Sequence, residues 1–532
     1  MNSMKRIKIY VGLLLFPALA ATVGCTGDFE NMNRNPNQVT DDQMDVMNYK
    51  VGTAITSLES LVVPVQEHMY QFNECLSGGP FAGYIGATVD TWRTKFETYN
   101  PSADWRKWPF ANVITAAYEP YRSVVTGTED EVAIALANVL RVAIMHRVTD
   151  SYGPIPYSAL VSNESVTVSY DKQEDVYGAM FEELDAAIAV LAANTTLPTE
   201  AFNRYDQVYY GNIGQWLRYA NSLKLRMAMR LCYVKPELSR AKAAEAIAAG
   251  VITTNADNAA MHAAENRTTL IFNDWADHRV GADILCYMNG YADPRLEKMF
   301  LKNDNGKFAG IRIGIDVESK SAAVTKCSNL IVTASTPYMW FTAAEAAFLR
   351  AEYELRWGTA DAAKTLYNQA IGLSFEQHGA AGAEAYAANN SLQPANFEDP
   401  MGKYDASALS SITVAWEDAP AEGGDPEAVR ERNLERIITQ KWIAIFPLGV
   451  EAWSEHRRTG YPRLLPVVVD NSGGTVDKAE GARRLPYPIE EYQKNNANLQ
   501  QAIGMLDAEA RGGRKGDNMG TRVWWDCKPS NN

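Results

Sequence analysis

Cysteine and histidine are scarce in this chain, which contains six of each among 532 residues. No CxxC pair occurs, and the histidines are far apart, without the spacing of metal ligands. With Cys25 set aside, the other cysteines are scattered and odd in number, so they cannot all pair. The sequence therefore argues against a disulfide scaffold and a structural zinc site, and we expect no cofactor.

The common catalytic signatures are also absent. The sequence has no HExxH, GxSxG or GxxxxGK[ST] motif, and no GxGxxG after a strand. Its 64 acidic residues guarantee that some carboxylates are neighbours, but no pair stands out as the acid and base of a glycosidase. We therefore expect a protein that is not an enzyme, with a hydrolase as the less favoured alternative.

Only one long hydrophobic run occurs, near the N-terminus. Lys5, Arg6 and Lys8 precede an almost wholly apolar stretch, 9–21. This stretch has about 13 residues, whereas a membrane-spanning helix needs about 20. The pattern is typical of an export signal, and we expect the remainder of the chain to lie outside the membrane.

Two cleavage sites compete at the end of this signal. Ala18-Leu19-Ala20 is a small-x-small site for ordinary secretion. The tetrapeptide that ends at Cys25 resembles a lipoprotein box, in which the cysteine is acylated, although Thr22 stands where leucine is usual. Residues 25–40 are rich in Asn, Gly, Asp and Pro, which favours a solvated tether behind a lipid anchor. We therefore predict a signal peptide over 1–24, lipidation of Cys25 and a flexible tether over 25–40.

Negative charge predominates, with a formal net charge of −14. Such a chain repels a polyanion, so we expect no nucleic acid as partner. Solubility alone accounts for a charge of this size and sign.

Helical periodicity recurs along the chain. In 176–191, bulky apolar side chains fall on one face and the acidic side chains lie away from it, while 131–147 is apolar nearly all round, which predicts a buried helix. In 341–374, two segments with small alanine seams join at Trp357-Gly358-Thr359, a pattern that resembles the tetratricopeptide unit. An ordinary helical domain is the alternative. Helix pairs are predicted over 131–194, 214–250 and 338–375, with a further long helix over 427–446.

Long segments of irregular sequence separate these helices. They are rich in Gly, Asn, Asp, Pro and aromatic residues, and loops of such length are usually functional or packed against a scaffold. No Gly/Ser linker divides the chain, so we predict one interleaved domain over 41–532, with the loops as a second layer on the helices. The segments are 75–110, 252–336, 376–426 and 460–532.

Two of these loops concentrate aromatic and polar side chains. Flat rings provide stacking surfaces for sugars, and Arg, Asn and Asp side chains exchange hydrogen bonds with hydroxyl or amide groups. The alternative is that some of these rings belong to the core. The candidate ligand-binding residues are Trp92, Arg93, Asn100, Trp105, Trp108, Asp274, Trp275, Tyr287 and Tyr291.

Two other polar groupings have a structural interpretation. Glu451, His456, Arg457 and Arg458 would suit an anionic ligand, but their aromatic and proline neighbours favour a buried junction. In that junction the arginines pair with nearby carboxylates or with carbonyls at helix ends. The turn Asp293-Pro294-Arg295 is interpreted as a loop tied down by its aspartate and arginine.

Seven stretches form an ordered set of motifs along nearly the whole chain. They are NRNPNQVT, ANVLRVAIMHRVTDSYGPIPYSAL, VYGAMFEELDAAIAVL, DPRLEKMF, WFTAAEAAFLRAEYELRWG, ITQKWIAIFPLGVEAWSEHRRTGYPRL and RRLPYPIEEYQKN. Together they resemble the SusD/RagB family, the outer-membrane nutrient-binding lipoproteins of Bacteroidetes. These are scaffold motifs, so they carry no ligand-binding residues over to this sequence.

The resemblance implies a mainly α fold. Four tetratricopeptide-like helix pairs would form a right-handed scaffold, covered by a loop-rich irregular layer that holds the ligand. It also implies a TonB-dependent outer-membrane transporter as partner, over which this protein would sit as a lid. Imported substrates in the family are mostly glycans and sometimes peptides.

We therefore expect a lipoprotein anchored in the outer membrane and exposed at the cell surface. It would capture an oligosaccharide without chemical change and deliver it to the transporter. A peptide ligand on the same fold is the first alternative, and a hydrolase or a purely structural adaptor are the others.

Overall fold

The computed structural model describes residues 49–161, 167–195, 204–420 and 423–529. The predicted signal peptide over 1–24, the lipidated Cys25 and the tether over 25–40 lie outside these residues. The start of the predicted domain at residue 41 lies outside them as well and stays a prediction. From Val51 onward the chain groups as one unit, which contains the helices and the inserted loops.

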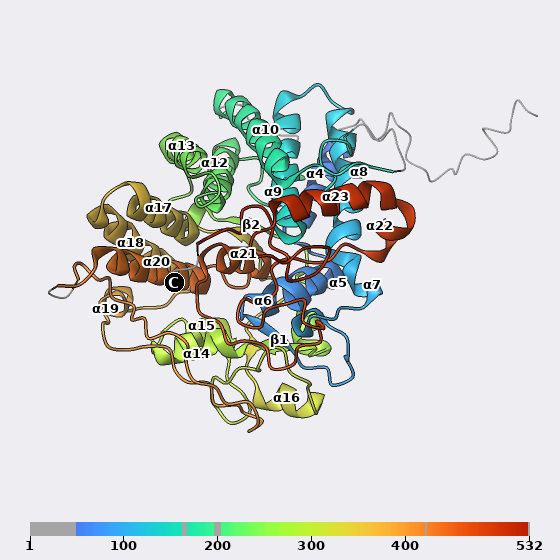
Figure 1. The fold of residues 1–532 in the computed structure, drawn as a ribbon. Helices are drawn as coiled ribbons and strands as arrows, with labels where there is room; N and C mark the ends of the chain where they lie inside the picture. Colours follow the sequence, from blue (N-terminus) through green and yellow to red (C-terminus); the bar gives the residue numbers. More distant parts are fainter. Residues whose placement is uncertain (1–48, 162–166, 196–203, 421–422, 530–532) are drawn as a thin grey trace, which may run out of the picture. The chain divides into compact units, whose positions relative to one another are not determined.

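Helix pairs form the scaffold, and neighbouring pairs contact each other (Figure 1). The paired helices are α9 (Glu131–Tyr152) with α10 (Gln173–Ala193), α12 (Ile213–Arg230) with α13 (Pro236–Ala249), α17 (Ala343–Trp357) with α18 (Ala360–Gln377), and α20 (Pro426–Ala444) with α21 (Gly449–Thr459). Helix α12 also packs against α10 and α17, and α17 against α20. The predicted mainly α fold of tetratricopeptide-like pairs is confirmed, and α21 lies in the segment interpreted from the sequence only as a buried junction.

Caps and small residues explain where α17 and α18 begin and how closely they pack. At their N-termini, Thr342 and Thr359 accept hydrogen bonds from the backbone N–H groups of Glu345 (3.1 Å) and Ala362 (3.2 Å). Buried alanines from both helices lie in the core. Because alanine is small and favours helix, this seam allows the close contact that the sequence predicts.

Helix α9 runs through the core. Among the described residues it is the one helix long and apolar enough to cross a membrane on length and composition, but 83% of its apolar window is buried by the fold. Asp130 caps it by accepting a hydrogen bond from the backbone N–H of Val132 (2.9 Å). The predicted buried helix is therefore confirmed.

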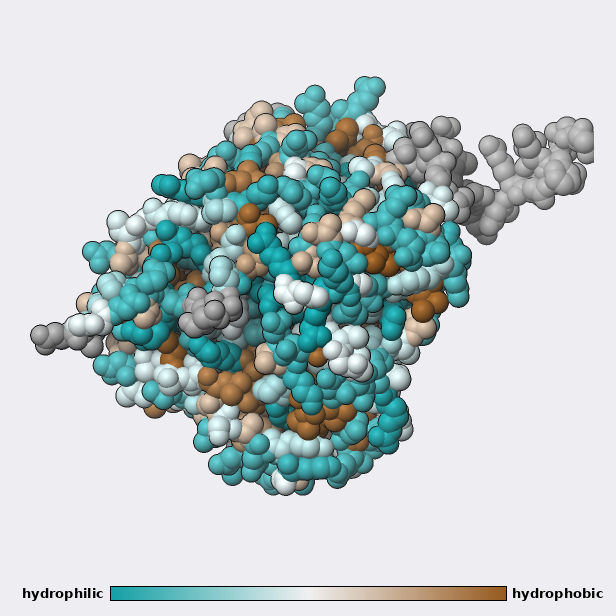
Figure 2. All heavy atoms as spheres, in the orientation of Figure 1, coloured by the Kyte–Doolittle hydropathy of each residue, from teal (hydrophilic) through white to brown (hydrophobic). Residues whose placement is uncertain are grey.

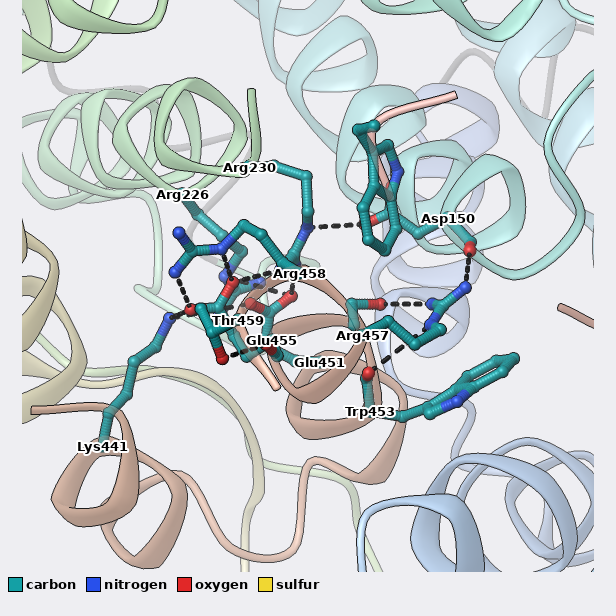
Figure 3. Close-up of polar contacts among 12 residues, drawn as sticks. Asp150, Arg226, Arg230, Lys441, Glu451, Trp453, Glu455, Arg457, Arg458 and Thr459 are labelled. Atoms are coloured by element: carbon teal, nitrogen blue, oxygen red, sulfur yellow. Dashed lines mark hydrogen bonds and ion pairs between the residues drawn. The ribbon is translucent and has the colours of Figure 1, made fainter. Parts of the chain in front are cut away.

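A buried ion network joins five of these helices, and Figure 3 shows part of it. Arg458 contacts Glu352 (2.6 Å) and Glu455 (2.7 Å), and Arg230 contacts Glu451 (2.6 Å) as well as Glu455. Cations and carboxylates balance, five against five, which confirms the predicted junction. The network consists of Arg226, Arg230, Arg356, Lys441 and Arg458 with Asp150, Glu345, Glu352, Glu451 and Glu455.

The turn at Asp293 and Arg295 is also structural, as predicted. Arg295 donates to Asp293 at 2.6 Å, and both side chains are fully buried. The same guanidinium lies over the rings of Phe375 and Tyr386 at 4.8 and 5.3 Å. This pair therefore fixes the loop layer against the end of α18.

Among the described residues, the inserted segments contain short helices and three two-stranded antiparallel sheets, which pair β1 with β3, β2 with β6, and β4 with β5. The strands are β1 (Ile85–Ala87), β2 (Ala259–Met261), β3 (His278–Val280), β4 (Phe300–Leu301), β5 (Asn329–Leu330) and β6 (Tyr338–Phe341). The further helices are α4 (Tyr49–Val62), α5 (Glu67–Tyr70), η2 (Gln71–Gly78), α6 (Gly79–Phe81), η3 (Phe96–Thr98), α7 (Ala103–Arg106), η4 (Trp108–Asn112), α8 (Val113–Val125), η5 (Asn255–Asp257), η6 (Leu270–Asp274), α14 (Ala282–Gly290), α15 (Leu296–Met299), α16 (Lys320–Lys326), α19 (Ala383–Ala387), α22 (Ile489–Lys494) and α23 (Asn496–Glu509).

Glu509, at the end of α23, gives the fold a pH-dependent stability. Burial, opposed by Lys172 and reinforced by Glu174 and Asp175, raises the pKa of its carboxyl to about 7. The stability from the neutral carboxyl is therefore complete below about pH 4.5 and is lost as the pH rises through 7. From pH 5 to 8, the free energy of unfolding measured in urea should fall by about 1–2 kcal/mol more in the wild type than in Glu509→Gln. Equal pH dependence in both proteins would contradict this assignment.

The surface carries its apolar residues in small, separate areas on the face in Figure 2, which is otherwise hydrophilic. Scattered exposed apolar residues are normal on a folded protein and do not identify a binding site. A ligand site must therefore be located from the arrangement of particular side chains.

Candidate functional site

The pairing of β1 with β3 brings two distant loops together. In this sheet Ala87 lies opposite His278, so the residues after β1 and the residues before β3 are at the same end. Thr88 extends the contact, because its backbone N–H donates to the carbonyl of Asp277 (2.8 Å) and its hydroxyl to that of Ala276 (2.6 Å). The loop with Trp92 and the loop with Trp275 therefore form one surface.

Four predicted tryptophans lie at this surface in a row of contacting rings, in which one linking ring, that of Phe72, is buried. We define the tryptophan patch as Trp92, Trp105, Trp108 and Trp275 together with the linking rings of Phe72 and His68. Each tryptophan is half-buried, so part of each ring faces solvent. Neighbouring centroids are 5.2 Å apart for Trp92 and Trp105, 5.6 Å for Trp105 and Phe72, 5.0 Å for Phe72 and Trp108, 6.1 Å for Trp108 and His68, and 5.2 Å for His68 and Trp275.

Buried polar contacts hold the loop that carries Trp92. The Lys95 ammonium donates to the Glu97 carboxylate (2.8 Å) and to the carbonyl of Ile315 (2.7 Å), and both charged side chains are buried. Ser102 caps α7 by accepting a hydrogen bond from the backbone N–H of Trp105 (3.3 Å). The rings therefore stand on a loop that is fixed by internal bonds, which lowers the cost of ordering them around a ligand.

The three predicted polar residues differ in what they offer a ligand. Arg93 and Asp274 are exposed, and Asp274 directly precedes Trp275. The Asn100 amide is instead used within the loop: its oxygen accepts from the Thr98 hydroxyl (2.7 Å) and its nitrogen donates to the carbonyl of Arg93 (3.2 Å). Asn100 therefore positions the loop, while Arg93 and Asp274 remain candidates for direct contact.

Tyr287 and Tyr291 lie in the core, 4% and 2% exposed. They sit on and after α14, and their hydroxyls donate to the carbonyls of Arg463 and Ile412 (both 3.0 Å). Because their faces are covered and their hydroxyls are bonded, neither ring can stack on a ligand at the surface. The expectation that these two belong to the ligand site is corrected.

Two ring residues of the patch were not predicted. His68 is on α5, with 48% of its side chain exposed, whereas Phe72 is on η2 and is buried (8% exposed), so it supports the neighbouring tryptophans and does not face the ligand. Phe72 is nearly parallel to Trp108, at an interplanar angle of 6°. Both residues lie in a helical stretch whose sequence gives no sign of a ligand-facing side.

Charges around the patch are largely paired within the protein. Glu67 binds Arg267 (2.6 Å), and hydrogen bonding from that guanidinium lowers the pKa of Glu67 to about 2. Asp277 likewise binds Lys320 (2.6 Å), and Asp104 binds Lys107. A surface of rings with internally neutralised charges suits an uncharged ligand with apolar faces.

A helical-repeat scaffold that presents a row of half-exposed tryptophans is an arrangement typical of ligand-binding proteins. The chain belongs to the SusD-like family, described as the SusD and RagB outer membrane lipoproteins, whose profile matches residues 31–526. The predicted family is confirmed, and the family's description places the protein at the outer membrane as a lipoprotein. SusD-like proteins are outer-membrane glycan-binding proteins.

Solved structures of related proteins share the fold over almost the whole chain. A SusD homolog from Bacteroides thetaiotaomicron is 50% identical, with a TM-score of 0.86 over 91% of this chain and 100% of that chain. One from Bacteroides ovatus is 40% identical, with a TM-score of 0.84 over 90% and 99%. A homolog from Flavobacterium johnsoniae, described as chitin-binding, is 34% identical, with a TM-score of 0.81 over 90% and 99%. A comparison with curated proteins found no match.

Proposed function

We propose that this protein captures an uncharged oligosaccharide on the tryptophan patch, at the cell surface, and delivers it to a TonB-dependent outer-membrane transporter. The observation that carries the proposal is the convergence of four tryptophans from two distant loops into one row of half-exposed rings. The transporter is supported by the family resemblance. The partnership with the transporter predicts that a TonB-dependent transporter co-purifies with the lipidated protein from outer membranes. Recovery of the protein without a transporter would argue against this partnership.

Stacking is the main source of affinity in this proposal. The apolar faces of successive sugar rings would lie on the indole rings, and Arg93 and Asp274 would exchange hydrogen bonds with hydroxyl groups at the edge of the patch. Affinity is modest, because a sugar gives up about as many hydrogen bonds to water as it gains. No bond in the ligand is broken.

Isothermal titration calorimetry against a panel of oligosaccharides tests this function. The panel includes oligomers of N-acetylglucosamine, since the relative from Flavobacterium johnsoniae is described as chitin-binding. It also includes neutral hexose oligomers and unstructured peptides of similar length. Binding of at least one neutral oligosaccharide, increasing with chain length over the span of the row, is the expected result. Binding of peptides alone would contradict the proposal, as would new reducing ends after incubation.

A further inference from the structure

Arg457 on α21 is a buried cation outside the balanced network. It is 2% exposed, and within the described part of the chain it forms no ion pair. Its guanidinium donates to the carbonyls of Asp150 (2.7 Å) and Arg483 (2.8 Å) and to the Ser454 hydroxyl (2.9 Å), and Figure 3 shows the contact with Asp150. Burial lowers its pKa to about 9, although the charges of Asp150 and Asp526 oppose this shift.

Arg457 forms part of the wall of a hollow that gathers positive charge. The hollow has a volume of about 320 Å³, near the lower end of the range for small-molecule sites, about 300–1,000 Å³. We call it the arginine pocket. Its charged wall residues are Arg457, Arg463, Arg483, Arg522 and Lys528 with Glu431 and Glu480.

Internal carboxylates neutralise only part of this charge. Arg522 binds Glu480 (2.8 Å) and Asp526 (3.1 Å), Arg483 also binds Asp526, and Lys528 binds Glu431. When Glu435, the partner of Arg463, is included, five cations face four carboxylates among the described residues, a surplus of one positive charge (5 − 4) in a chain whose formal net charge is −14. A local surplus opposite in sign to the whole chain attracts anions to this site.

Arg463 provides free donors at the mouth of the pocket. Its side chain is 52% exposed and makes one long ion pair, from Nε to the carboxylate of Glu435 at 3.5 Å. In the portion of the chain that the structure describes, its two terminal nitrogens donate no hydrogen bond. A guanidinium whose terminal nitrogens are unbonded can donate hydrogen bonds to two oxygens of one oxyanion at once.

We propose that the arginine pocket is a second binding site, which takes a small molecule carrying a carboxylate, sulfate or phosphate group. Arg463 donates hydrogen bonds to the oxyanion. Electrostatic attraction retains the anion in the pocket and comes from the surplus charge of Arg457, Arg483, Arg522 and Lys528. The pocket has no wall residue in common with the tryptophan patch, so this inference goes beyond the proposed glycan function and does not depend on it.

Differential scanning fluorimetry and calorimetry of the full chain test the second site at constant ionic strength. The probes are sodium glucuronate, sodium sulfate and glucose. Glucuronate or sulfate should raise Tm saturably, whereas glucose should not. Arg463→Gln should weaken anion binding at least about tenfold, since a charge-assisted hydrogen bond is lost. Arg240→Gln, which removes the same charge from an exposed position on α13, should leave it unchanged.

The outcomes separate the possible anions and expose a wrong assignment. If glucuronate binds more tightly than sulfate, the ligand of the proposed site is an anionic group on a sugar. If the two bind equally, the ligand of the same site is a free oxyanion. The proposal would be overturned if glucose raised Tm as much as the anions do. It would also be overturned if Arg463→Gln and Arg240→Gln lost the same amount of anion affinity. Loss of anion binding in Trp108→Ala would also overturn it, because the anion would then lie at the tryptophan patch. Retained anion binding by a protein that binds no oligosaccharide would reject only the glycan function.

Discussion

Glu455→Gln is expected to lower the free energy of unfolding by about 3–5 kcal/mol. Glu455 contacts Arg230, Lys441 and Arg458 in the buried network. Although burial alone would raise its pKa, these cations hold the pKa of the carboxyl well below its usual value. A glutamine of the same size removes one negative charge and leaves three buried cations without full compensation, which costs far more than an exposed ion pair.

Urea unfolding followed by far-UV circular dichroism measures this loss. Glu384→Gln, an exposed substitution on α19, is the matched control and should change stability by no more than about 0.5 kcal/mol. A loss below about 1 kcal/mol in Glu455→Gln would show that the network contributes little to the stability of the helix pairs.

The helix pairs were predictable because their signal is local. In α10, for example, Tyr177, Met180, Phe181 and Leu184 recur at helical spacing and are all buried, as that spacing requires. The Ala-rich seam of α17 and α18 is equally visible in a contiguous stretch. Such patterns depend on residues a few positions apart, so no distant contact has to be known.

The ion network was only partly predictable. The sequence around Glu451 and Glu455 indicates internal pairing, since arginines follow within one or two helical turns. The partners Arg230 and Lys441 lie on other helices, and which of them meet depends on how the pairs stack. A charge pattern therefore identifies a buried junction without identifying its members.

The candidate ligand site was the least predictable part. The tryptophan patch depends on the three-residue strands β1 and β3, which pair residues about 190 positions apart and have no clear pattern of their own. Composition indicated the aromatic loops as candidates, but it did not distinguish Trp275, which faces solvent in part, from Tyr287, which is buried. Tyr287 lies on α14, inside a segment that was expected to be irregular, so its burial follows from a helix that the sequence analysis did not predict.

The order of rings in the patch leads to a graded prediction for ligand binding. Trp108 stands between Phe72 and His68 and so connects the two halves of the row, whereas Trp92 and Trp275 are its ends. A ligand that spans the row contacts the central ring in every binding position, while either end can be left empty. Trp108→Ala should therefore weaken oligosaccharide binding at least about thirtyfold, and Trp92→Ala or Trp275→Ala only about three- to tenfold.

Calorimetric titration of each variant with the best neutral oligosaccharide measures these losses. Trp357→Ala removes a half-buried tryptophan at the end of α17, outside the patch, and should bind like the wild type. Because Trp108 also packs against Phe72, far-UV circular dichroism and Tm establish that the variant is folded before its affinity is compared. If Trp108→Ala is folded and binds as tightly as Trp357→Ala, the ligand lies elsewhere, and the row of rings has a structural role.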